Sequence, residues 1–174
     1  MKYLLSLIVI FFTVENVLGQ RCEKRVDAFT NESVSTFEWR PRGMRTIFFE
    51  SRNKVNIMEF RTSELIAVEY TVPKGSEVLL KLENGEVIEL KTINDSKSTV
   101  ASMTMSESDN LVYSTYFLKM EVTPEHLQKM AAYKVTDLRY PDLHGGSRSL
   151  SDKELRNKWQ RLIMDGSKCM LGLK

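Results

Sequence analysis

The chain has 174 residues, of which 42% are hydrophobic and 28% are charged, and this composition is typical of a folded globular protein. Its formal net charge of +2 argues against the strongly basic surface of a nucleic-acid-binding protein. It has two histidines and two cysteines, none with the spacing of an HExxH or CxxC motif, so the sequence predicts no metal and no cofactor.

The first residues predict a secretory signal peptide over residues 1–19. Lys2 supplies a positive start, and residues 3–14 form an apolar run of about a dozen residues, the length of a signal core. That run is too short to span a bilayer, which needs about 20 apolar residues, so we expect no transmembrane anchor after processing. Small Gly19 predicts cleavage before Gln20. The remaining ~155 residues, 20–174, are enough for one globular domain that is secreted or periplasmic.

The two cysteines, Cys22 and Cys169, lie near the two ends of the predicted mature chain. In an oxidising compartment they can form one intramolecular disulfide, which would fix the N-terminal segment to the tail after the last helix. Two alternatives remain open at this point. The thiols can stay separate, or one can be catalytic, although neither cysteine has a CxxC partner or a neighbouring histidine.

The middle of the chain predicts an antiparallel meander. Residues 21–37 are polar and weakly periodic, which predicts an irregular entry or a short edge strand. Asn84-Gly85 separates two apolar runs and predicts a hairpin with a type I′ turn. Lysines and glutamates along the strands discourage pairing between chains, and the oligomeric state is left open. The predicted strands are 46–50, 55–60, 65–72, 78–82, 87–90, 98–105 and 111–122.

The C-terminal third predicts two helices and one more strand. Thr123-Pro124 is a helix start, with Thr as N-cap and Pro at the first helical position. Residues 134–140 predict a strand. Ser151 and Glu154 form a capping box that opens a second helix, and Gly166 is placed as the residue after its end.

These elements predict an α+β fold, with a β-rich antiparallel sheet of about seven or eight strands and two helices near the C-terminus. The amphipathic helices and the one-sided sheet can bury their apolar faces against each other. A β-sandwich with the helices packed at one end is the alternative.

The whole predicted mature chain resembles small exported Bacteroidetes proteins to which no function is assigned. The resemblance rests on Phe37-Glu38-Trp39, on the hairpin at 81–86, and on the step from strand to helix at 122–127. It implies a bacterial periplasmic or surface setting, and it carries no catalytic residues to this chain.

Two segments are candidate ligand sites. In the loop 142–148, His144, Ser147 and Arg148 accompany two glycines whose N–H groups can approach an anion. A plain strand-to-helix connection explains the same glycines. The other segment combines Trp39 with Arg40 and Arg42, which suit stacking on a sugar or holding an acidic partner.

The main hypothesis for the function is an exported, non-catalytic binding or interaction module. Its partner would be a protein, a glycan or an envelope component, bound through a sheet edge or through the two candidate segments. The alternative is a small secreted hydrolase, or a hydrolase inhibitor, that uses the 142–148 loop. That alternative needs Asp142 or Asp137 within hydrogen-bond reach of His144.

Overall fold

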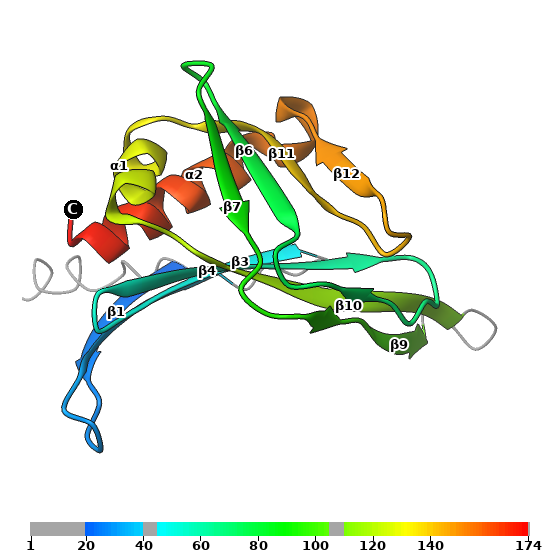
Figure 1. Cartoon of the computed structure of the whole chain (residues 1–174), viewed down its shortest axis with the longest axis horizontal. Helices are drawn as coiled ribbons and strands as arrows, with labels where there is room; N and C mark the ends of the chain where they lie inside the picture. The colour runs from blue at the N-terminus through cyan, green and yellow to red at the C-terminus, as the bar shows by residue number, and fades with distance from the viewer. Residues whose placement is uncertain (1–19, 40–44, 105–109, 174) are drawn as a thin grey trace, which may run out of the picture.

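The computed structural model describes residues 20–39, 45–104 and 110–173. These residues form twelve antiparallel strands in three sheets, together with two helices late in the chain. Figure 1 shows a six-stranded sheet as one layer, with both helices and a four-stranded sheet over one of its faces. The predicted β-rich α+β class is confirmed. The strands outnumber the predicted seven or eight because the entry segment contains two strands, residues 96–97 form a short one, and the loop after Pro141 contains another.

The three sheets and the helices have the following bounds. The large sheet has the order β1-β2-β3-β4-β10-β9, with β1 (Gln20–Val26), β2 (Ser33–Trp39), β3 (Arg45–Arg52), β4 (Val55–Glu64), β10 (Asn110–Glu121) and β9 (Thr99–Thr104). The small sheet has the order β12-β11-β6-β7, with β12 (Ser147–Leu150), β11 (Val135–Pro141), β6 (Glu77–Leu82) and β7 (Val87–Lys91). A short pair joins β5 (Thr71–Val72) to β8 (Ser96–Lys97). The helices are α1 (Pro124–Ala132) and α2 (Asp152–Leu171).

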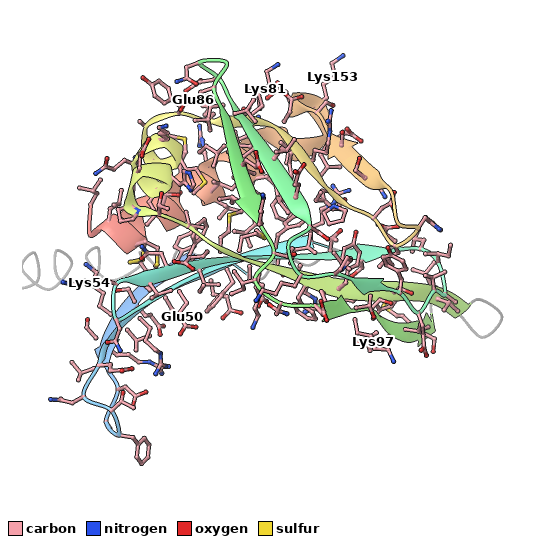
Figure 2. The ribbon with its side chains drawn as sticks, viewed as in Figure 1. Glu50, Lys54, Lys81, Glu86, Lys97 and Lys153 are labelled. Carbon is pink, nitrogen blue, oxygen red and sulfur yellow. A yellow bond between two sulfur atoms is a disulfide. The ribbon has the colours of Figure 1, made fainter. Side chains whose placement is uncertain are left out.

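The core lies between the inner face of the large sheet and the layer above it. Every second residue of β4 is buried, including Met58 and Phe60, because successive side chains of a strand point to opposite faces. The Phe60 ring meets the ring of Tyr140 from β11 edge to face, with centroids 5.1 Å apart. On the opposite, outer face the side chain of Glu50 points away from the helices (Figure 2). The large sheet thus has one covered face and one face open to solvent, on which polar residues such as Glu50 and apolar residues such as Phe117 are mixed.

The type I′ turn occurs at a different hairpin from the predicted one. Between β3 and β4, Asn53 and Lys54 have φ angles of 50° and 67°, which a two-residue type I′ loop requires. Between β6 and β7, Gly85 alone has a positive φ, 87°, and its N–H donates to the carbonyl oxygen of Leu82 at 2.9 Å. The β6–β7 hairpin is confirmed, and the type I′ assignment at Asn84-Gly85 is wrong.

The predicted strand 65–72 is a strand only at its end, in β5. Its alternation is retained, because the even-numbered residues are more buried than the odd-numbered ones. Several backbone groups of Ile66, Val68 and Tyr70 bond to the hydroxyls of Ser98 and Ser114 instead of to a neighbouring strand. The N–H of Val68 donates to Ser114 Oγ at 2.9 Å, and the N–H of Tyr70 donates to Ser98 Oγ at 2.9 Å. Hydrophobic periodicity indicates which residues are buried. It does not indicate whether the backbone of the segment is hydrogen-bonded to a neighbouring strand or to side chains.

Both helices begin where the sequence predicts. The hydroxyl of Thr123 accepts the N–H of His126 at 3.1 Å, and Ser151 and Glu154 form the capping box. The predicted end of the second helix at Gly166 is wrong, since α2 continues to Leu171 and ends on Gly172, whose φ is 72°. Gly166 instead lets the helix approach the sheet, where an added Cβ would lie 2.4 Å from Phe49 Cδ2.

Cys22 and Cys169 form a disulfide with a Cα–Cα distance of 5.7 Å. Cys169 lies in the last turn of α2, so the bridge joins β1 to the helix itself and not to a tail beyond it. A disulfide of this kind indicates an oxidising environment outside the cytosol. In the described part of the chain, neither helix has the length and apolar character needed to cross a membrane.

Candidate functional site

The residues predicted as ligand contacts are spread over the molecule. Trp39 is the last residue of β2, and Arg40 and Arg42 lie outside the described residues. His144 is an exposed residue of the turn between β11 and β12. Ser147 and Arg148 open β12 and are also exposed. Of these residues, Ser147 takes part in a hollow of the surface.

This hollow, here called the turn groove, has a volume of about 410 Å³. It lies between two turns that are far apart in sequence, residues 73–76 before β6 and residues 142–146 after β11. Its lining residues are Tyr70, Val72, Pro73, Gly75, Ser76, Glu77, Pro141, Gly145, Gly146 and Ser147.

Thr92, which is buried, fixes the first wall. Its Oγ1 donates to the carbonyl oxygen of Pro73 at 3.0 Å and accepts the N–H of Ser76 at 3.0 Å. Its backbone carbonyl accepts the N–H of Gly75 at 2.8 Å. Every one of these bonds ties the turn to the end of β7, so this wall is rigid before any ligand arrives.

Asp142 and Leu143 fix the second wall. The carboxylate oxygen Oδ1 of Asp142 accepts the N–H groups of His144 and Gly146, both at 2.9 Å. Leu143 is buried in the core and anchors the turn from below. Since the Gly146 N–H already donates within the turn, it is not available to an anion, and the predicted anion-binding use of these glycines is wrong at Gly146.

Tyr70 forms the floor between the walls. Gly145 has a φ of 78°, and a Cβ at this position would lie 3.1 Å from the Tyr70 hydroxyl oxygen. A Cβ at residue 145 would therefore require a small shift of the Tyr70 hydroxyl, and the positive φ of Gly145 would strain any L residue there. Glycine is required here by its conformation and by the close approach of the ring.

A buried polar pair supports the groove from behind. The Tyr116 hydroxyl lies 2.9 Å from Glu64 Oε1 and 3.1 Å from the carbonyl oxygen of Pro141, to either of which it can donate. Burial raises the pKa of Tyr116, and the negative charge of Glu64 raises it further, so this hydroxyl keeps its proton. The bond to Pro141 holds the edge of the groove against the large sheet.

Tyr140 lies near this pair but is bonded differently. Its hydroxyl is buried and makes no well-aligned hydrogen bond with the described residues, although the Thr62 side chain lies close to it. Burial raises the pKa of Tyr140, and the positive charges of Arg45 and Arg148 oppose that rise.

The hydrolase alternative lacks the contact that it requires. In the described residues, Asp142 Oδ1 bonds to backbone N–H groups, and Asp137 lies 4.0 Å from Lys81 Nζ. Neither carboxylate is hydrogen-bonded to the imidazole of His144, so these residues do not form the expected acid–base pair. Within the same described ranges, no group of three His, Cys, Asp or Glu side chains could hold a metal ion.

No family model, curated protein or solved structure matches this chain. The resemblance to exported Bacteroidetes proteins therefore stays a prediction, and the site is interpreted from its own geometry.

Sequence reasoning missed most of the groove. Residues 73–76 lie between the predicted strands 65–72 and 78–82, and Tyr70 lies within the first of these strands. The groove arises because two distant turns meet, which no local pattern encodes. In the sequence, only the pair Gly145-Gly146 indicated a ligand site, and this pair does lie in one of the two turns that form the groove.

Proposed function

We propose that this protein is an exported binding module that holds a glycan in the turn groove. The observation that carries the proposal is the pair of turns, pinned by Thr92 and Asp142, that keeps the groove open on either side of Tyr70. Walls that are already ordered lose little conformational entropy when a ligand binds.

The lining suits a neutral, hydroxyl-rich ligand. Tyr70 and the two prolines offer flat apolar surfaces to the C–H groups of a sugar ring. Ser147 and Glu77 can exchange hydrogen bonds with sugar hydroxyl groups, and Ser76 Oγ, which donates to the carbonyl oxygen of Pro73 at 2.7 Å, can accept one. The nearby carboxylates disfavour an anion, which distinguishes a glycan from a phosphate or an acidic peptide.

The predicted leader and the disulfide together support export. We place the protein in the periplasm or outside the cell, with cleavage between Gly19 and Gln20. The intact mass of the secreted protein, which should begin at Gln20, checks this part of the proposal.

The binding part can be tested by NMR titration. The ¹⁵N-labelled mature protein is titrated with soluble oligosaccharides of glucose, N-acetylglucosamine, xylose and mannose. We expect one of them to shift the amide signals of Ser76, Gly145 and Gly146. The variant Tyr70→Ala should weaken that binding by about tenfold or more, because the ring supplies the stacking surface.

A matched control is Tyr133→Ala, because Tyr133 is 40% exposed at the end of α1, outside the groove. This variant should bind the oligosaccharide as the wild type does. The proposal fails if none of the four sugars shifts the groove amides, or if Tyr133→Ala weakens binding as much as Tyr70→Ala.

A further inference from the structure

Strand β9 forms one edge of the large sheet. It pairs with β10 on one side, and no other strand of the described residues pairs with it on the other. Figure 1 shows it at the rim of the sheet, remote from α1 and α2. An edge strand offers a row of backbone N–H and C=O groups to any strand that can lie beside it.

The other edges of the two larger sheets carry charges that discourage such pairing. Strand β1 contains Glu23, Lys24 and Arg25; β7 contains Glu89 and Lys91; β12 contains Arg148. Strand β9 reads TVASMT and contains no charged residue and no proline. It is the one outer strand of these sheets, as far as the structure describes them, without this protection.

Apolar side chains are exposed along the same edge. Val100 and Met103 of β9 are 40% and 47% exposed, and Val112, opposite Ser102 on β10, is 39% exposed. The nearest charge before the strand, Lys97, is paired with Glu69, with Nζ and Oε2 3.5 Å apart (Figure 2). The edge thus combines free backbone groups with uncovered apolar surface.

We propose that β9 pairs antiparallel with β9 of a second copy of this chain. A two-fold axis would join the two large sheets into one continuous sheet, in the isologous manner usual for homodimers. A second copy is the occupant that this edge fits, because a strand without charges meets no like charge when it faces itself, in any register. Strand β9 contributes no residue to the lining of the turn groove.

The mass of the mature protein in solution tests this proposal. Light scattering after size exclusion, over a series of concentrations, should give twice the chain mass at the upper end. The variant Val100→Lys places a charge on both sides of the axis and should raise the dimer dissociation constant by about tenfold or more. Met103→Lys, on the same strand, is a second variant with the same expected effect should the first fail to fold.

The matched control is Val87→Lys on the charged edge strand β7, where Val87 is 54% exposed. It should leave the dissociation constant unchanged. A wild-type protein that is monomeric at every concentration overturns the proposal. So does a dimer that both β9 variants leave intact, because its interface would then lie elsewhere.

Discussion

Two buried tyrosines differ in what their hydroxyls contact. Tyr116 donates to Glu64 or to the carbonyl oxygen of Pro141, whereas the Tyr140 hydroxyl makes no well-aligned hydrogen bond in the described part of the chain and lies near the Thr62 side chain. Both side chains are fully buried. A buried hydroxyl stabilises a fold through its hydrogen bonds, so residues of the same type should contribute unequally here.

Replacing each tyrosine by phenylalanine measures this difference. Tyr116→Phe should lower the free energy of unfolding by about 1–3 kcal/mol, because it leaves a buried carboxylate oxygen without its donor. Tyr140→Phe should change it by less than about 1 kcal/mol, since its hydroxyl makes no well-aligned hydrogen bond to a described residue and interacts only weakly with Thr62. Urea denaturation of both variants gives the comparison. Equal losses would contradict the assignment of partners.

Alkaline pH checks the same residue independently. The pKa of Tyr116 in the folded state is raised above its unfolded value of 10.0, by burial first and by Glu64 second. Its contribution to stability is complete below pH 10 and is lost as pH rises above that value, when the unfolded state releases the proton. The slope is at most about 1.4 kcal/mol per pH unit. As the pH is raised above 10, the free energy of unfolding of Tyr116→Phe should fall less than that of the wild type.

At the scale of elements, α2 lies close to the large sheet at Gly166. Gly166→Ala should destabilise the protein by about 1–3 kcal/mol, because the new Cβ would lie 2.4 Å from Phe49 Cδ2. The sign of the change in the free energy of unfolding distinguishes packing from helix propensity, since Gly→Ala at an exposed helix position stabilises by about 1 kcal/mol. Urea denaturation measures the effect.

Two further variants separate packing from helix propensity. Asn157→Ala, at an exposed position of α2, should be neutral or slightly stabilising. In a Phe49→Leu background the cost of Gly166→Ala should shrink, because the smaller side chain leaves room for the Cβ. An unchanged cost in that background would locate the strain elsewhere.

Local sequence patterns predicted an element correctly where the element depends on interactions between residues that are close in sequence. The N-cap at Thr123, the capping box at Ser151 and the β6–β7 hairpin all follow from short-range chemistry. The predicted helix end at Gly166 was wrong because the sequence does not distinguish a glycine that ends a helix from a glycine that lets a helix pack closely against a sheet. Only the tertiary partner, Phe49, separates the two roles.

The candidate site was predicted less well than the fold. The 142–148 loop was identified, and Ser147 does line the groove. Thr92 and Tyr116 hold the groove in shape from β-strand segments with no distinctive motif. Their roles depend on which distant turn each side chain reaches, and that contact follows from the packing of three sheets.

For the whole molecule, the disulfide closes a loop with a sequence separation of 147 residues. The double variant Cys22→Ser/Cys169→Ala should lower the free energy of unfolding by about 2–5 kcal/mol, because a long loop restricts the unfolded chain strongly. Urea denaturation and hydrogen exchange of the β1 amides check this expectation. Reduction of the wild type should reproduce the loss, and a change below about 1 kcal/mol in both would contradict it.

The bridge also sets how the protein responds to mechanical force. Tension applied to the chain on the outer sides of Cys22 and Cys169 passes through the two sulfur atoms and leaves the β1–β2 pairs that follow Cys22 unloaded. Under load the folded protein is a short tether of nearly constant length. The residues inside the loop can extend only after the bridge is reduced, so reduction would be the step that lets the tether lengthen.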